Sequence, residues 1–452
     1  MSFYSTARRA LRPVGTLAAA FTLASCSNDI LNVGTPDVLS SDVLGGPLGA
    51  TTLRNGAQQD FVVGFSGTQD GFLVSTGNMS DEIQTSDTFA DRYFTDGRKQ
   101  NEVLGGATNT LYNGLHLART GLTAAIQAWT KAKSATNTSV RDSLSEMYSL
   151  RGFSEDFFAE AYCSGVPFSS TTSDGTPVYG QPLTTAQMLA ISSASFDTAN
   201  STATGVAVKS LAAIGKARAL LNLGQFAQAA AAVSGVATSY KYTVFHSIAT
   251  TRQQNGLFNA AYQANSRYTV GTKEGVNGLD FLTTPADPRV PWSPSTRTGF
   301  NADPNLPLEL KYPAQNSNVV LADGIEARLI EAEARLQGAT QADRDAVFAS
   351  LNALRATGLT AAITPLAAAA QTQDAAVDML FKERAFWLWL TGHRMGDMRR
   401  LVRQYKRDQA TVFPVGAMPL RRGESFGTDV NFVVPFTERN NPNFNGCIDR
   451  NP

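Results

Sequence analysis

Apolar residues recur at steps of three and four along much of the chain, which is the spacing of one face of an α-helix. Two long stretches follow it, from Leu111 to Trp129 and from Val140 to Ala161. A third region, 374–405, has the same period with a break at Thr391 and Gly392. The pattern predicts a mainly α-helical fold.

Two shorter segments, 206–236 and 323–356, predict pairs of antiparallel helices. In the first, Gly224 ends one helix, and the small side chains of Ala217 and Ala229 permit close approach of the two. The spacing resembles that of a tetratricopeptide unit. A generic helical hairpin explains each segment alone nearly as well, but several such units together favour a helical-hairpin scaffold.

Two regions, 64–106 and 241–322, lack a sustained helical period. The first is rich in Gly, Asp, Thr and aromatic residues, and the second is rich in proline. A loop region this long inside a compact protein is usually functional or disordered, and the aromatic residues argue against disorder. We expect both regions to be irregular, loop-rich binding regions of a single α-helical domain that spans 47–452.

The first residues, 1–25, have the architecture of a signal peptide. Arginines precede a short apolar run, Val14–Leu23, which is too short to anchor the chain across a bilayer. Small residues then precede Cys26, and this ending resembles the lipobox of bacterial lipoproteins. We expect the leader to be removed, Cys26 to carry lipid that holds the protein on a membrane, and 26–46 to act as a tether.

Composition and motifs argue against several functions. The 452 residues include 38 basic and 38 acidic side chains, and loss of Arg8, Arg9 and Arg12 with the leader leaves a small acidic excess. This balance does not favour nucleic acid. The sequence has no zinc-protease, nucleophile-elbow, phosphate-loop or dinucleotide-binding motif. Its three histidines lack partners at metal-binding spacing, so neither a metal nor a cofactor is expected.

Aromatic residues in the two irregular regions are the candidate binding residues. A flat ring stacks on the apolar face of a sugar while polar side chains bond its hydroxyl groups. For each ring the alternative is a packing role. Acidic residues 81, 82 and 87 are more consistent with solvated loop carboxylates than with a glycosidase pair. The predicted ligand-binding residues are Phe72, Asp81, Tyr93, Tyr262, Tyr268, Arg289 and Trp292.

The two remaining cysteines are Cys163 and Cys447. An exported compartment permits a disulfide between them. Two separate buried thiols are an equally good expectation, because separation along the sequence does not report distance in the fold.

An ordered series of segments resembles one known family. The series includes L-N-V-G-T-P-D-V-L from Leu31, S-L-R-G-F-S-E-D-F-F-A-E-A-Y-C from Ser149, D-P-R from Asp287 and K-E-R-A-F-W-L-W-L-T-G-H-R-M-G-D from Lys382. Together with Cys26, it is similar to the SusD/RagB family of outer-membrane nutrient-binding lipoproteins over nearly the whole mature chain.

The resemblance implies a tetratricopeptide-like scaffold whose loops bind an oligosaccharide or a peptide. It also implies a lipid-anchored position on the outer membrane, facing the cell exterior, and a TonB-dependent, SusC-like barrel as partner. Capture without catalysis is the leading interpretation. A lipid-anchored glycan hydrolase and a scaffold that only holds other proteins remain as alternatives.

One motif departs from the family pattern E-R-x-x-E-L-x-x-E-G-x-R. Trp387 and Thr391 replace its two later acidic residues, which indicates a divergent branch. The charged residues that match this region are expected to form structural ion pairs. They are Glu383, Arg384, Arg394 and Asp397.

Overall fold

The computed structural model describes residues 46–452, apart from 104–105, 135, 173–175, 263–264 and 358–360. The predicted signal peptide, Cys26 and all but the last residue of the predicted tether therefore lie outside the described residues. Within the described residues helices dominate and the strands are short, which confirms the mainly α-helical prediction.

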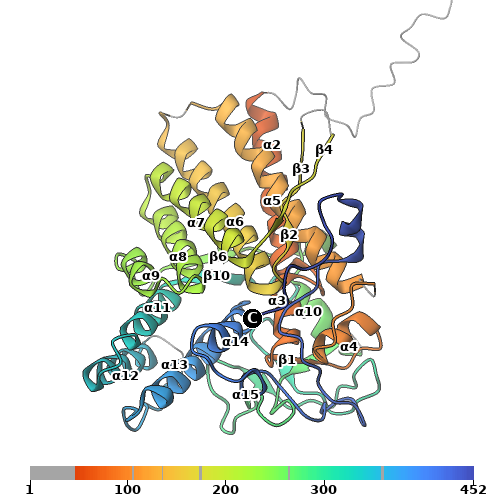
Figure 1. Cartoon of the computed structure of the whole chain (residues 1–452), viewed down its shortest axis with the longest axis vertical. Coiled ribbons are helices and arrows are strands. Elements are labelled where there is room, and N and C mark those ends of the chain that lie inside the picture. Colours follow the sequence, from red (N-terminus) through yellow and green to blue (C-terminus); the bar gives the residue numbers. More distant parts are fainter. Residues whose placement is uncertain (1–45, 104–105, 135, 173–175, 263–264, 358–360) are drawn as a thin grey trace, which may run out of the picture.

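One group of helices packs side by side in the upper half of the molecule (Figure 1). Its members are α2 (Pro47–Val62), α5 (Gly106–Ala132), α6 (Thr138–Ala161), α7 (Thr185–Thr202), α8 (Val206–Asn222) and α9 (Phe226–Val233). The packing is closest around Phe196 of α7. A Cβ on Gly215 of α8 would lie 2.1 Å from a carbon of that ring, so the small residue is required there.

Two helices joined by a short turn occupy each segment in which a hairpin is predicted. The first pair is α8 and α9, and the second is α11 (Gly324–Leu336) and α12 (Gln341–Arg355). Gly224 follows α8 with a φ of +74°, a conformation that favours glycine and ends the helix. Asp323 caps α11 by accepting a hydrogen bond of 2.8 Å from the Glu326 N–H.

The C-terminal helices are α13 (Gln373–Trp387), α14 (Arg394–Arg403) and α15 (Gln409–Val412). The predicted break is present, and Gly392 adopts a φ of +82° within it. The charged residues of this region form buried ion pairs, as predicted from the motif. Glu383 accepts hydrogen bonds from Arg289 and Arg355, and Arg384 donates two to Asp397, at 2.7 and 2.9 Å.

The expectation of an irregular, loop-rich region over 64–106 is wrong for much of that stretch. It contains α3 (Phe72–Met79), β1 (Ile83–Thr85) and α4 (Ala90–Asp96), and it begins within a π-helical turn, Val63–Gly67. Every residue of α3 is buried. A short helix that is buried on all sides has no polar face, so it shows no amphipathic period in the sequence.

Region 241–322 consists of short elements joined by loops. They are β6 (Lys241–Val244), a 3₁₀ turn (Thr251–Gln253), α10 (Gly256–Ala261), β7 (Tyr268–Val270), β8 (Trp292–Ser293), β9 (Leu308–Glu309) and β10 (Val319–Asp323). β6 pairs with β10 and β8 with β9, both antiparallel. β7 pairs with β1, with Tyr268 opposite Thr85, so this ladder joins the two irregular regions.

Two further antiparallel pairs lie between α6 and α7. β2 (Val166–Pro167) pairs with β5 (Pro182–Leu183), and β3 (Ser170–Thr171) pairs with β4 (Pro177–Val178). The residues of β3 and β4 are exposed. These strands form an arm along the side of the helical group (Figure 1).

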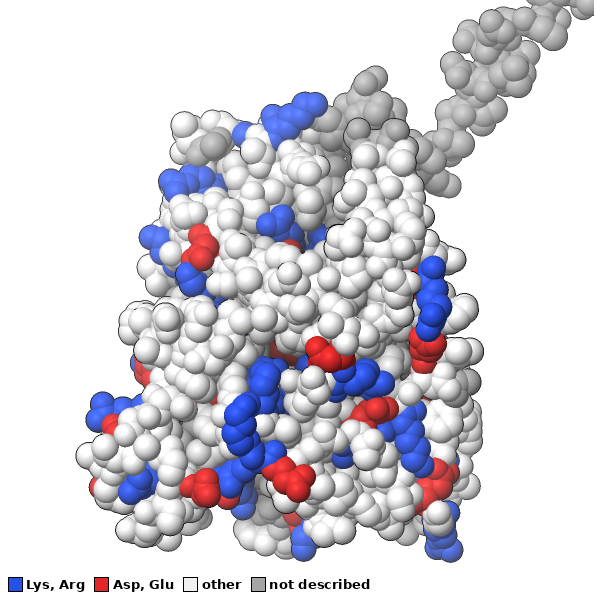
Figure 2. Space-filling model, viewed as in Figure 1, with Lys and Arg blue, Asp and Glu red and all other residues white. Residues whose placement is uncertain are grey.

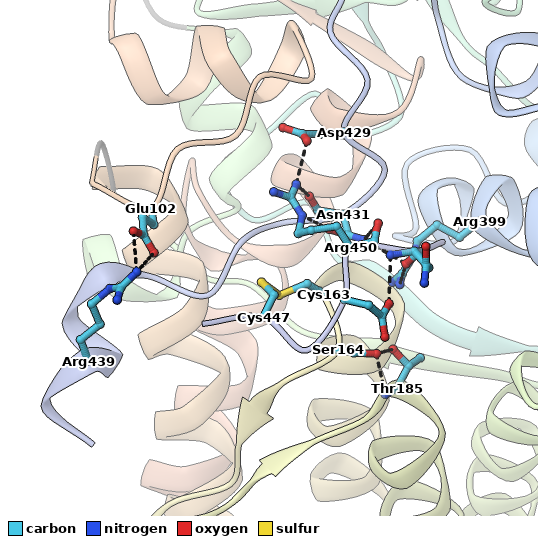
Figure 3. The surroundings of a disulfide bond; sticks show 12 residues. Glu102, Cys163, Ser164, Thr185, Arg399, Asp429, Asn431, Arg439, Cys447 and Arg450 are labelled. Atoms are coloured by element: carbon cyan, nitrogen blue, oxygen red, sulfur yellow. Dashed lines mark hydrogen bonds and ion pairs between the residues drawn. A yellow bond between two sulfur atoms is a disulfide. The ribbon is translucent and has the colours of Figure 1, made fainter. Parts of the chain in front are cut away.

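A disulfide fastens the C-terminal segment to the end of α6 (Figure 3). The sulfur atoms of Cys163 and Cys447 are 2.07 Å apart and the Cα atoms 5.9 Å apart, which settles a pairing that the sequence leaves open. Backbone hydrogen bonds reinforce this junction, because the Phe432 N–H donates to the Ala161 carbonyl at 2.8 Å and the Cys163 N–H donates to the Phe432 carbonyl at 2.9 Å.

Candidate functional site

Some of the predicted ligand-binding residues are buried in the core. Phe72 is 0% exposed, and its ring stacks on Phe157 with the centroids 3.9 Å apart. Tyr268 is 3% exposed within β7. Neither ring has an open face for a ligand, so both contribute to packing, and this corrects the role predicted for them.

Two of the predicted polar contacts, Asp81 and Arg289, are committed to buried ion pairs. Asp81 accepts two hydrogen bonds from the guanidinium of Arg394, at 2.7 and 2.8 Å. Arg289 bonds Asp287 on its own loop and Glu383 on α13. Removing one partner of such a pair leaves a buried charge uncompensated. Their role is therefore structural, which corrects their prediction as ligand contacts.

The other predicted rings, those of Tyr93, Tyr262 and Trp292, are partly exposed. The Tyr93 hydroxyl donates a hydrogen bond to Glu424, and the Tyr262 hydroxyl donates one to the backbone carbonyl of Glu309. Trp292 packs against the hydrophobic core from β8. Contact between these rings and a ligand stays a prediction.

Segments far apart in the sequence meet next to α4 and α10. The Ser86 N–H donates to the Arg267 carbonyl, the Asn301 N–H to the Ser86 carbonyl, and the Phe300 N–H to the Ser266 carbonyl, each at 2.8 Å. These bonds hold the segment before α4, the segment after α10 and the 297–303 loop in one surface, which we call the aromatic–arginine site. Its residues are Phe89, Tyr93, Tyr262, Phe300, Arg92, Arg267, Arg297 and Arg421.

Each ring of this site lies against one guanidinium. The distances from guanidinium carbon to ring centroid are 5.2 Å for Arg92 and Phe89, 4.6 Å for Arg421 and Tyr93, 5.7 Å for Arg297 and Tyr262, and 4.3 Å for Arg267 and Phe300. All are within the range of cation–π attraction. Phe89 and Phe300 remain 43% exposed, so the contacts orient these rings and leave part of each open.

Asp87 organises the centre of the site. Its carboxylate accepts a hydrogen bond from the Phe89 N–H at 3.0 Å, and it also bonds the guanidinium groups of Arg92 and Arg267. Burial favours the neutral acid, but the bonds from the two arginines outweigh it and lower the pKa of Asp87. The charged carboxylate therefore ties the start of α4 to the chain after α10.

Polar groups surround the rings. Glu424 accepts hydrogen bonds from the Tyr93 hydroxyl and from the Lys99 ammonium, the latter at 3.1 Å, and Asp303 accepts one from the Ser86 hydroxyl at 2.6 Å. In Figure 2 charged side chains of both signs gather on the lower half of the face in view, and those on the upper half are mainly scattered Lys and Arg. Open rings beside donors and acceptors suit a polyhydroxylated ligand, because sugar faces stack on rings and hydroxyl groups bond the polar atoms.

A separate cavity of about 330 Å³ lies between β10, α13 and the loop that carries Arg289. None of its lining residues belongs to the aromatic–arginine site. Its charged lining residues are engaged within the protein: Glu326 bonds Arg218 twice at 2.8 Å and lies 3.1 Å from His393, and the Lys311 ammonium donates a hydrogen bond to the Trp389 carbonyl.

Other chemistry finds little support in the described part of the chain. It contains no group of three or more His, Cys, Asp or Glu residues placed to hold a metal ion. Asp81 and Glu82 are 0% and 1% exposed, so neither acid is open to a substrate as one member of a glycosidase pair. Among the described helices, none has the length and apolar character needed to cross a membrane.

The sequence prediction omits several residues of this site. Arg92 follows Phe89 by three positions, a spacing at which side chains meet on a helix, so recognition of α4 would have connected the two. Arg421 comes from the Pro- and Gly-rich C-terminal region, and Phe300 from a loop. Neither carries a periodic signal that places it beside α4.

Comparison with known proteins identifies the fold. No family model and no curated protein matches the sequence. A SusD superfamily protein from Bacteroides fragilis matches with 14% identity and a TM-score of 0.64, over 89% of this chain and 100% of its own. A laminarin-binding SusD-like protein matches with 14% identity and a TM-score of 0.61, over 89% of this chain and 99% of its own.

A third solved structure is a SusD-like carbohydrate-binding protein, also from Bacteroides fragilis. It matches with 11% identity and a TM-score of 0.64, over 89% of this chain and 100% of its own. The chain therefore has the SusD-like fold, which confirms the fold that the sequence resemblance implies. At these sequence identities the structural similarity establishes the fold, and the ligand has to be inferred from the residues of the site.

Proposed function

We propose that this chain, which has the SusD-like fold, captures glycans at the aromatic–arginine site. The observation that carries the proposal is the partial exposure of Phe89 and Phe300, each 43% exposed, on a surface that also holds guanidinium donors and carboxylate acceptors. Structural neighbours that bind laminarin and carbohydrate support a sugar ligand.

The proposed role is capture rather than conversion. Glycoside hydrolysis ordinarily requires two carboxyl groups that reach the scissile bond from opposite sides. Asp87 is 0% exposed and bonded to two arginines, and Asp70 is held by Arg92 at 2.7 Å. Each of the two acids beside the rings already accepts hydrogen bonds within the protein, Asp303 from Ser86 and Glu424 from Tyr93 and Lys99. Release of new reducing ends from a bound glycan by the purified protein would contradict this part of the proposal.

Glycan binding is tested by calorimetric titration of the purified mature protein with a panel of oligosaccharides. Truncation of both rings, Phe89→Ala with Phe300→Ala, is expected to weaken binding about tenfold or more, because each stacking contact contributes about 0.5–1.5 kcal/mol beyond area burial. Phe245→Ala is the matched control, since this ring is 74% exposed and lies outside the site. Equal losses in the control, or no loss in the double variant, would overturn the assignment.

We further propose that lipid on Cys26 anchors the mature chain to the outer membrane, facing the cell exterior, and that it passes its ligand to a TonB-dependent, SusC-like barrel. The lipobox-like ending before Cys26 and the family resemblance support both steps. Detergent extraction of whole membranes, followed by capture of the protein, tests them together. Recovery from the soluble fraction would contradict the anchor, and recovery from membranes without a β-barrel protein would contradict the partner.

A further inference from the structure

The arginines of the aromatic–arginine site differ in how their charges are balanced. Arg92 donates hydrogen bonds to both Asp70 and Asp87, and Arg267 donates two to Asp87, at 3.0 and 2.8 Å. Arg421 donates one hydrogen bond to the backbone carbonyl of Asp87 and stacks on Tyr93. Among the residues that the structure describes, no carboxylate forms an ion pair with Arg421.

The two acids that interact electrostatically with Arg421, Glu424 and Asp96, are in different states. Glu424 accepts hydrogen bonds from the Tyr93 hydroxyl and the Lys99 ammonium, and these contacts help to lower its pKa. Asp96 is buried, and burial raises its pKa to about 7 although Arg421 opposes the rise. Arg422, the next residue, is exposed. The loop at 421–422 therefore carries two cations, and Arg421 interacts with the Glu424 charge without forming an ion pair with it.

A cation held on a ring is well placed to meet an anionic ligand. The guanidinium of Arg421 lies 4.6 Å from the centroid of Tyr93, so stacking restricts its orientation. A planar guanidinium forms paired, charge-assisted hydrogen bonds with carboxylate or sulfate oxygens. A sugar ring that stacks beside Tyr93 would bring a substituent of this kind within reach of Arg421.

We propose that the site is selective for glycans that carry anionic groups, and that Arg421 is the residue that confers this selectivity. The inference rests on the proposed function, because it assumes that a glycan binds at the aromatic–arginine site. Selectivity by charge is also screened by salt, since this pairing occurs at the protein surface.

The test titrates the full mature protein with neutral glucan oligomers, oligogalacturonates and sulfated oligosaccharides of matched length. The two charged ligands distinguish a carboxylate from a sulfate ester as the preferred group. We expect at least one of them to bind about tenfold more tightly than the neutral oligomer at low salt. The difference is expected to shrink in 0.5 M NaCl, because the electrostatic screening length decreases with salt, from about 10 Å at 0.1 M to about 3 Å at 1 M.

The Arg421→Gln variant is expected to lose most of the anionic preference, and Arg421→Lys, which keeps the charge, to retain part of it. Arg439→Gln is the control, because this exposed arginine likewise stacks on a ring, that of Phe436, outside the site. Circular dichroism of each variant separates a binding effect from misfolding. The lysine variant provides a second, charge-preserving comparison if the glutamine variant does not fold.

The outcomes separate the inference from the proposed function. Equal affinity for neutral and anionic oligomers, with binding still lost on truncation of Phe89 and Phe300, would overturn the charge selectivity and leave glycan capture intact. An anionic preference that survives in Arg421→Gln would overturn the role of Arg421. Failure of the wild type to bind any of the three ligand classes would overturn both proposals.

Discussion

Phe72 and Phe89 are both phenylalanines of the first irregular region, and their surroundings give them opposite roles. Phe72 is fully buried against Phe157, and Phe89 is 43% exposed beside Arg92. We expect Phe72→Ala to lower the free energy of unfolding by about 3–5 kcal/mol, because truncation leaves a cavity in a closely packed core. Urea unfolding measures this change.

Phe89→Ala is the matched comparison at this scale. Loss of a partly exposed ring is expected to change the free energy of unfolding by no more than about 1 kcal/mol, while it weakens glycan binding. If Phe72→Ala folded with unchanged stability and bound glycan more weakly, the packing role assigned to Phe72 would be wrong and a ligand-binding role would replace it.

The sequence does not distinguish these two rings, because the distinction depends on what covers each of them. Phe157 covers Phe72 from α6, a contact between residues far apart in the chain. The position of Arg421 over Tyr93 likewise depends on how the C-terminal loop packs. The residue type therefore predicts which side chains are able to stack, and tertiary contacts decide which of them remain open.

The bond between Cys163 and Cys447 joins the end of α6 to the C-terminal segment across a sequence separation of 284 residues. Closing so long a loop restricts the unfolded chain, and removal of a native disulfide typically costs about 2–5 kcal/mol. We expect the double variant Cys163→Ser, Cys447→Ser to lose stability in that range, measured by urea unfolding under oxidising conditions.

Reductant provides the control for this prediction. Dithiothreitol is expected to lower the unfolding midpoint of the wild type toward that of the double variant, and to leave the variant unchanged. Equal midpoints for wild type and variant without reductant would show that the hydrogen bonds between Cys163 and Phe432 hold the segment without the disulfide.

At the scale of elements, predictability follows length. Helices α5, α6 and α13 are long enough for an amphipathic period to show, and the sequence predicts all three regions. α3 and α4 have 8 and 7 residues, and the strands have five or fewer, too short for a clear period. The pairing of β1 with β7 depends on contacts between distant segments, so local patterns do not contain it.

The molecule as a whole buries carboxyl groups in two electrostatic environments. Burial favours the neutral form of Glu326, but Arg218 and His393 outweigh it and lower its pKa to about 2. Burial dominates at Glu82 and Glu309 and raises the pKa of Glu82 to about 8 and that of Glu309 to about 7. The first acid is charged in the folded protein over most of the pH range, and the other two bind a proton near neutrality.

These two groups of acids have opposite effects on stability. Glu326 has an ordinary pKa of 4.5, so its contribution is present above that pH and is lost as the pH falls toward 2. For Glu82 and Glu309 the folded state holds protons that the unfolded state releases above pH 4.5, so stability decreases as the pH rises toward 7 or 8. These acids therefore favour mildly acidic solution, whereas His116, whose pKa burial lowers, favours a pH above its ordinary value of 6.5.

Glu82 offers a direct test, because its environment favours a neutral side chain. Its Oε1 accepts a hydrogen bond of 2.7 Å from the Leu390 N–H, which the amide oxygen of glutamine also accepts. The Asp81 charge raises the pKa of Glu82 further, while Lys311 and Arg394 oppose the rise. We expect the urea midpoint of the wild type to decrease as the pH is raised from about 5.5 to about 7.5. The midpoint of Glu82→Gln is expected to decrease less over the same pH range.

A substitution of a surface acid is the control that shows whether the pH dependence comes from the burial of Glu82. Glu102→Gln removes a carboxylate whose partner, Arg439, is exposed, so its midpoint is expected to follow the wild type across the same pH range. At about pH 7.5 the Glu82 variant is expected to match or exceed the wild type in stability, because it avoids the cost of ionising a buried group. A midpoint that falls as steeply in Glu82→Gln as in the wild type would show that other groups carry the pH dependence.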